Sequence, residues 1–110
     1  MKNKTTFTKD DLRGFILLFC ANANFEVSQL EYEYIEPRIG TSNFKNLYME
    51  ILRRNDYQII TEIQSSIQKI NFTKEDVETL LDEIKNMFRI DTSNYNQKRN
   101  VFRGLKRILL

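Results

Sequence analysis

The sequence predicts an all-α protein, a compact single-domain bundle of about six helices. Apolar residues recur every three or four positions through most of the chain, and no stretch alternates between apolar and polar residues with a period of two. Short polar segments that contain helix-capping residues separate these periodic runs. The chain has 110 residues, of which 41% are hydrophobic. This is enough for one core without a disulfide or a structural metal.

The first helix is predicted to begin directly after a polar N-terminal segment. Residues 1–7 are mostly polar and are expected to be flexible, whereas residues 8–110 are expected to form the single helical domain. Thr8 lies three positions before Asp11, which is the spacing of a capping box. Residues 12–20 are apolar on almost every helical face. We therefore expect this helix to lie at the centre of the bundle.

The turn after the first helix contains the residues that are predicted to cap the second. Asn24, Ser28 and Glu31 are assigned to this structural role, and Ser28 and Glu31 have capping-box spacing. The same turn could be interpreted as a cation site, but it lacks the glycine and the aspartate that such loops use. We therefore expect no metal. Pro37 and Gly40 predict that the second helix is short.

The later helices are predicted from their apolar periodicity and from the polar residues that precede them. Asn55 and the pair Thr73 and Asp76 are expected to begin the fourth and fifth helices, and an Asn/Asp-rich turn precedes the last. The residues predicted to face the core are Leu30, Tyr34 and Ile35 in the second helix; Phe44, Leu47, Tyr48, Ile51 and Leu52 in the third; Ile60, Ile63, Ile67 and Ile70 in the fourth; Val77, Leu80, Leu81, Ile84, Met87 and Phe88 in the fifth; and Val101, Phe102, Leu105, Ile108 and Leu109 in the last.

Few residues in the sequence are typical of catalysis or cofactor binding. Histidine is absent and the three glycines lie far apart, so the chain has neither a histidine base nor a glycine-rich phosphate loop. Cys20, the single cysteine, falls in the apolar first helix and is interpreted as a core residue. The acidic residues of the fifth helix are interpreted as a solvated face rather than as catalytic carboxylates. They are Glu75, Asp76, Glu78, Asp82 and Glu83. We predict no enzymatic activity, no catalytic residue and no cofactor.

The last helix predicts an interaction surface. Residues 91–110 contain five lysines and arginines but a single acidic residue. Four of these cations fall opposite or beside the apolar stripe of the helix: Arg99, Arg103, Lys106 and Arg107. We therefore expect them to form an exposed basic strip. The net charge of the whole chain is only +2, which is low for a dedicated nucleic-acid-binding domain. We therefore expect a protein partner, acidic or membrane-associated, ahead of nucleic acid.

Two helix pairs within the chain are weakly similar. The corresponding positions, 67 residues apart, are Leu17 and Ile84, Asn24 and Asp91, and Ile35 and Phe102. Both segments run from an apolar helix through an Asn/Asp-rich turn into an amphipathic helix. This similarity suggests a bundle made of two related helix pairs.

The first turn and the end of the chain also carry a family resemblance. The residues concerned are Ala21, Ala23, Asn24, Val27, Ser28, Glu31 and Ile35, and, in the second half, Asp91 and the ending FRGLKRIL. Their pattern of a small-residue helix end, a turn, an apolar residue and Ser-x-x-Glu before a helix resembles the tellurite-resistance TerB-like domain. The resemblance covers most of residues 8–110 in helix order. Where that family has an acidic residue followed by glycine, this chain has Asn24 and Phe25, and Asp91 is followed by Thr92.

The resemblance implies a bacterial, all-helical accessory or scaffolding domain that is associated with stress responses and membrane-linked complexes, from a family with no firmly assigned enzymatic activity. We expect a non-enzymatic protein-interaction or accessory module. Two alternatives stay open: a nucleic-acid-associated protein that uses the basic last helix, and a small inhibitor from a phage or a defence system. A single cysteine fits a reducing compartment, and no apolar stretch is long enough to span a bilayer. We therefore expect a cytoplasmic protein without a transmembrane segment.

Overall fold

The computed structural model describes residues 7–24, 26–92 and 95–110. Within these residues the chain forms α-helices and one short 3₁₀ turn, and it contains no strand. The elements are α1 (Lys9–Ala21), η1 (Asn22–Asn24), α2 (Gln29–Ile39), α3 (Thr41–Leu52), α4 (Asp56–Lys69), α5 (Lys74–Ile90) and α6 (Tyr95–Leu109). The prediction of an all-α bundle of about six helices is confirmed. Of the segment predicted to be flexible, residues 1–6 lie outside the described residues.

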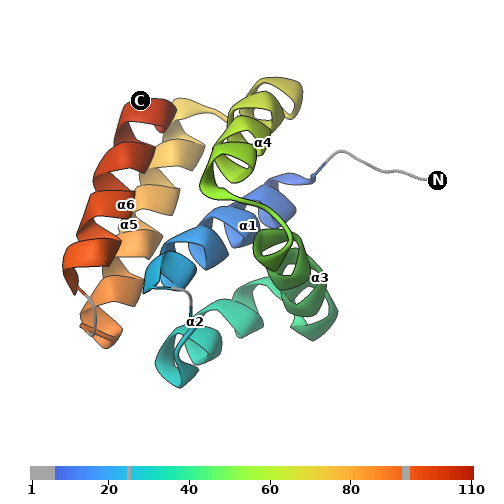
Figure 1. Ribbon diagram of the computed structural model, residues 1–110. Helices are drawn as coiled ribbons and strands as arrows, with labels where there is room; N and C mark the ends of the chain where they lie inside the picture. The colour runs from blue at the N-terminus through green and yellow to red at the C-terminus, as the bar shows by residue number, and fades with distance from the viewer. Residues whose placement is uncertain (1–6, 25, 93–94) are drawn as a thin grey trace.

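The helix α1 runs through the centre of the bundle, and the other helices lie around it (Figure 1). Residues 14–21 are all buried. In the view of Figure 1, α5 and α6 stand side by side at the left, α2 and α3 lie below and to the right, and α4 lies above. A helix that is apolar on every face is stable only when neighbours cover every face. The central position expected for the first helix is therefore observed.

Four of the described helices begin with a capping box. The pairs are Thr8 and Asp11 for α1, Ser28 and Glu31 for α2, Asn55 and Gln58 for α4, and Thr73 and Asp76 for α5. In each pair the first side chain accepts a hydrogen bond from the backbone N–H of the second residue, and the second side chain accepts one in return. These bonds satisfy donors that the helix itself leaves unpaired.

Two glycines shape the corner formed by α1, α2 and α3. A Cβ atom at Gly14 would lie 2.8 Å from Cγ2 of Ile39, so glycine at this position lets α2 approach α1 closely. Gly40 has a φ of +88°, a backbone conformation that favours glycine, and α3 begins at the next residue. Pro37 lies inside the last turn of α2, which continues to Ile39 and ends at Gly40.

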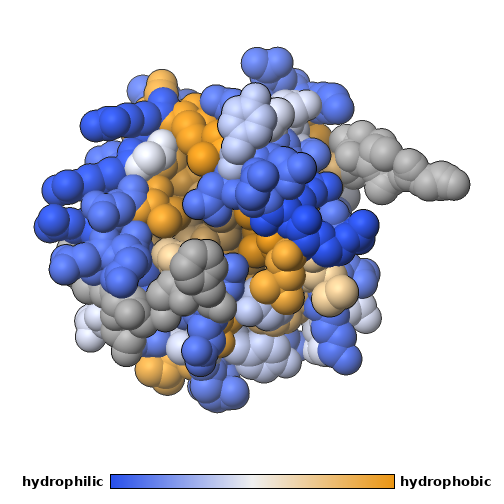
Figure 2. Space-filling view, in the orientation of Figure 1, coloured by the Kyte–Doolittle hydropathy of each residue, from blue (hydrophilic) through white to orange (hydrophobic). Residues whose placement is uncertain are grey.

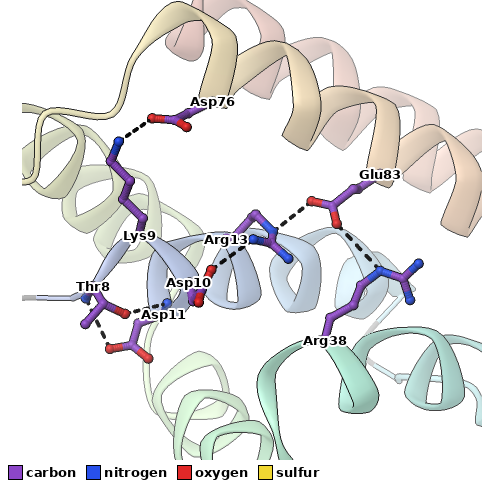
Figure 3. A network of polar contacts seen from close by, with 8 residues as sticks. All are labelled: Thr8, Lys9, Asp10, Asp11, Arg13, Arg38, Asp76 and Glu83. Carbon is purple, nitrogen blue, oxygen red and sulfur yellow. Dashed lines mark hydrogen bonds and ion pairs between the residues drawn. The ribbon is translucent and has the colours of Figure 1, made fainter.

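A network of ion pairs joins α1 to α2 and α5 (Figure 3). Glu83 forms ion pairs with two arginines: Oε1 lies 2.9 Å from Arg13 Nε, and Oε2 lies 3.5 Å from Arg38 Nε. Near the starts of α1 and α5, a second ion pair forms, with Lys9 Nζ 2.8 Å from Asp76 Oδ2. The side chain of Glu83 is only 16% exposed, so the interpretation of this acid as part of a solvated face is wrong. It connects three helices instead.

The core contains most, but not all, of the residues predicted to be buried. Leu80 and Leu105 lie in one core, as predicted. Leu30 and Leu52 do not, because they are 46% and 55% exposed. In α4 the buried residues are Ile59, Ile63 and Ser66, whereas Ile60, Ile67 and the C-cap residue Ile70 are half-buried. Two overlapping stripes of isoleucine both have helical spacing, and only packing against the other helices selects between them.

Candidate functional site

A groove of about 450 Å³ lies between α5 and α6. Five of the residues that line it carry a positive charge: Lys85, Arg89, Arg99, Arg103 and Lys106. Phe88, Phe102 and Thr92 provide the rest of the lining, and none of the described residues that line the groove is acidic. This groove is called the basic groove below.

Both helices contribute to the basic groove with the same spacing. α5 provides residues 85, 88 and 89, the segment that follows it provides residue 92, and α6 provides residues 99, 102, 103 and 106. The α6 positions are i, i+3, i+4 and i+7, and the α5 positions are the first three of this series, so each set shares one face of its helix. The local sequences are also alike: KNMFR spans residues 85–89 and RNVFR spans residues 99–103. The groove is therefore formed where two similar helix faces meet.

Two phenylalanines form the apolar part of the basic groove. The rings of Phe88 and Phe102 pack edge to face, with centroids 6.3 Å apart. Phe88 is buried, whereas Phe102 is half-buried. The ammonium groups of Lys85 and Lys106 lie 5.9 Å and 5.8 Å from the centroid of the Phe102 ring. These cation–π contacts hold two of the charges beside the apolar surface.

The charges in the basic groove have one sign. Arg89 Nη1 donates to Asn86 Oδ1 at 2.8 Å, and this neutral partner leaves the positive charge of the guanidinium uncancelled. A concave surface lined by charges of one sign concentrates its field and attracts ligands of the opposite sign. The groove can therefore bind an anionic group and bury an apolar group beside it.

The basic strip predicted from the sequence overlaps the basic groove only in part. Arg99, Arg103 and Lys106 line the basic groove, whereas Arg107 is exposed outside it. Sequence reasoning missed the half of the groove that α5 contributes, including Lys85 and Arg89. The repeated pattern of a basic residue, Asn, any residue, Phe and Arg was a signal that could have revealed it.

One cation of α6 points into the protein instead. Lys98 is 1% exposed, and its ammonium group lies 2.7 Å from Oε2 of Glu31, which is equally buried. Asp91 Oδ2 lies 4.0 Å from the same ammonium group. A buried charge needs such partners, because burial removes its hydration. The contact joins α6 to the start of α2 and fixes which face of α6 is turned outward.

Glu31 therefore has two structural roles at once. Its Oε1 accepts the backbone N–H of Ser28 in the capping box at 3.0 Å, while Oε2 pairs with Lys98. The same 67-residue offset that relates the two halves of the sequence separates Glu31 from Lys98. Corresponding positions of the two helix pairs thus meet in the interior. The third residue assigned to this turn, Asn24, ends the 3₁₀ turn, and its side chain lies outside the described part of the structure.

The described residues contain little that resembles a reactive centre. Cys20 is fully buried, and this burial raises the pKa of its thiol, as does the nearby carboxylate of Glu31. Its thiol is therefore inaccessible and protonated at neutral pH. Among the described residues, no group of three or more Cys, Asp and Glu side chains is placed to hold a metal ion. No helix in this part of the chain is both long and apolar enough to cross a membrane.

The chain was also compared with known proteins. No family model, no curated protein and no solved structure matches it. The fold and the basic groove define an all-α bundle with a cationic, partly aromatic groove. The resemblance to the TerB-like domain stays a prediction.

Proposed function

We propose that this protein is a non-enzymatic interaction module, and that its basic groove binds an acidic segment of a partner protein. The observation that supports this function is the groove itself: five cations from two helices surround a pair of phenylalanines, without an acidic residue in the described lining. Five like charges around one concave surface repel one another and attract a ligand of the opposite sign, which would neutralise them.

An acidic peptide fits the basic groove better than a nucleic-acid strand. Single strands are generally held by exposed aromatic faces on which the bases stack. Phe88 is buried, and two ammonium groups already contact the ring of Phe102. Carboxylates need no such face, because they can pair with the lysines and arginines while an apolar side chain packs against the exposed part of Phe102.

The cellular role and the location that we propose rest on the sequence. The resemblance to the TerB-like domain supports an accessory role in a bacterial stress response, and the single cysteine supports a cytoplasmic location. Cys20 is a poor candidate for a nucleophile because its thiol is buried and its pKa is raised. This favours an interaction role over catalysis.

The proposal can be tested with defined probes. Fluorescence anisotropy compares a short acidic peptide containing phenylalanine, the same peptide with lysines in place of its acids, a single-stranded DNA and a duplex. We expect only the acidic peptide to bind with saturation. Arg103→Glu combined with Lys106→Glu should weaken this binding by at least about tenfold, because both reversals place a like charge beside the ligand.

A matched control keeps the change in net charge the same. Lys45→Glu combined with Lys74→Glu also reverses two exposed cations, but neither residue lines the basic groove. We expect this control to bind the acidic peptide as the wild type does, and both double variants to melt close to the wild type. Tighter binding of either DNA than of the peptide, with a steep dependence on salt, would instead support the nucleic-acid alternative. Equal effects of the two double variants would show that the groove has no special role.

A further inference from the structure

The basic groove has an approximate two-fold symmetry. α5 and α6 stand side by side and are separated in the chain only by residues 91–94, so they run in opposite directions (Figure 1). A shift of 14 residues relates the segments 85–89 and 99–103, which share Asn, Phe and Arg at matching positions and begin with a cation. The phenylalanines of the two segments are in contact, with centroids 6.3 Å apart. The symmetry axis therefore passes close to the two rings.

This symmetry places cations at both ends of the basic groove and apolar surface at its centre. Lys85 and Arg99 each precede the phenylalanine of their helix by three residues. Because the helices are antiparallel, these two cations lie on opposite sides of the rings, about 9 Å apart along the helix axes. Arg89 and Arg103 directly follow the phenylalanines and lie near the centre. The order of cation, apolar centre and cation is thus the same from either end.

Such an order favours an extended segment with one apolar residue between two acids. Alternate residues of an extended chain project to the same side at intervals of about 6.6 Å, so acids at i and i+4 flank an apolar residue at i+2. A segment this short is not stable as a helix by itself. The outer side of α6 carries mainly hydrophilic side chains (Figure 2). One apolar residue, packed on the half-buried ring of Phe102, is therefore sufficient on this side.

The two ends of the basic groove differ in charge. Lys106 adds a second cation to the end that contains Lys85, and both ammonium groups lie within 5.9 Å of the centroid of the Phe102 ring. The position 14 residues before Lys106 is Thr92, which is uncharged, so the opposite end has Arg99 as its cation. The more acidic end of a bound segment is attracted to the end with two lysines.

We propose that the basic groove recognises a segment of the form acid-x-apolar-x-acid, and that the charges at its ends, rather than the direction of its chain, set its orientation. The more acidic end lies against Lys85 and Lys106, whether it is the N-terminal or the C-terminal end. Two similar halves offer similar side-chain contacts to a segment that runs either way. This inference rests on the proposed function, because it specifies the acidic segment that the groove binds.

The order of residues is tested with peptides of identical composition. One peptide has its phenylalanine between the two acids, and two others have it before or after both acids, again at every second position. Fluorescence anisotropy measures their dissociation constants. We expect the first peptide to bind at least about tenfold more tightly than the other two, because only its acids reach both ends of the groove while the ring lies at the centre.

The orientation is tested with a nitroxide label at the N-terminus of two longer peptides. Both contain the acid-x-apolar-x-acid segment, and two further acids extend it at the N-terminal end in one peptide and at the C-terminal end in the other. The label broadens the amide NMR signals of the protein residues near it. We expect broadening around Lys85 and Lys106 with the first peptide and around Thr92 and Arg99 with the second.

Lys106→Thr makes the two ends of the groove alike, because it repeats the threonine of position 92. We expect each labelled peptide to broaden signals at both ends of the groove in this variant. Lys45→Thr is the matched control, since it makes the same exchange at an exposed position of α3 outside the groove. It should leave each peptide in the orientation found with the wild type.

Three results would overturn the inference while the proposed function stands. One is equal binding of the three peptides of identical composition. Another is broadening at the same end of the groove by both labelled peptides, since the direction of the chain would then set the orientation. The third is an orientation in Lys106→Thr as strict as in the wild type. If none of the acidic peptides binds, the proposed function fails as well, so the two failures are distinguishable.

Discussion

Lys98 and Arg99 are neighbours on α6, yet their side chains lie in opposite environments. Lys98 is 1% exposed and pairs with Glu31 at 2.7 Å, whereas Arg99 is exposed and lines the basic groove. Successive residues of a helix point about 100° apart, so one side of α6 can carry a structural cation and another side cations for a ligand. The charge of a residue therefore does not indicate its role until its burial is known.

The energetics of the two regions differ for the same reason. The buried pair of Lys98 and Glu31 costs desolvation of both charges, which their attraction offsets only while both are present. The exposed cations of the basic groove remain hydrated and contribute little to folding individually. Substitutions in the interior should therefore change stability, and substitutions in the groove should change binding.

The largest expected effect on stability is that of Lys98→Ala. Removing this side chain leaves the carboxylate of Glu31 buried without its cation, and such a change typically costs about 3–5 kcal/mol. The free energy of unfolding from urea denaturation measures it. Lys106→Ala, on the exposed side of the same helix, is the control and should change this free energy by less than about 0.5 kcal/mol.

A double variant sharpens the interpretation of the buried pair. Lys98→Met combined with Glu31→Gln removes both charges, and glutamine can still close the capping box with Ser28. It should recover much of the stability lost in Lys98→Ala, because no unpaired charge stays in the core. A cost for Lys98→Ala as small as that for Lys106→Ala would contradict the buried ion pair.

A smaller effect is expected for Ser28→Ala, at the cap beside the buried pair. Loss of an N-cap side chain typically costs about 0.5–2 kcal/mol. The cost should be the same with and without millimolar calcium, because the turn is explained by capping and by the contact with Lys98. A melting temperature that rises with calcium in the wild type, and no longer does so in Glu31→Gln, would instead show a cation site in this turn.

The smallest effect is expected at the exposed pair of Lys9 and Asp76. The hydrogen bond from Lys9, with that from the Thr73 backbone, lowers the pKa of Asp76 from 3.8 to about 2. Because the folded-state pKa is the lower one, the resulting stabilisation is present above about pH 3.8 and is lost as the pH falls towards 2. Lys9→Ala should raise the pKa of Asp76 and make the loss of melting temperature over this range shallower.

An NMR titration of the Asp76 carboxyl carbon measures this change directly. Lys45→Ala removes an exposed lysine of α3 and is the control, because it should leave the titration of Asp76 where it is in the wild type. An unchanged titration of Asp76 in Lys9→Ala would show that the ion pair does not form in solution. The same pair then could not be counted among the contacts that join α1 to α5.

Contacts between residues close in the chain could be predicted from the sequence. The capping pairs at Thr8, Ser28 and Thr73 join residues three positions apart, so the backbone of a single turn of helix brings them together. The central position of α1 was also readable, because apolar residues occupy nearly every face of that helix. Three of the four arginines and lysines predicted for the basic strip do line the groove.

Contacts between distant segments were decided only by the tertiary structure. The stripe of α4 that is buried, the two arginines that Glu83 joins and the α5 half of the basic groove all depend on how neighbouring helices are rotated. Lys98 is the clearest case, because its position falls on the apolar side of α6 while its side chain carries a charge. Such a lysine can be buried only where folding brings a carboxylate to it, and the carboxylate of Glu31 comes from 67 positions earlier in the chain.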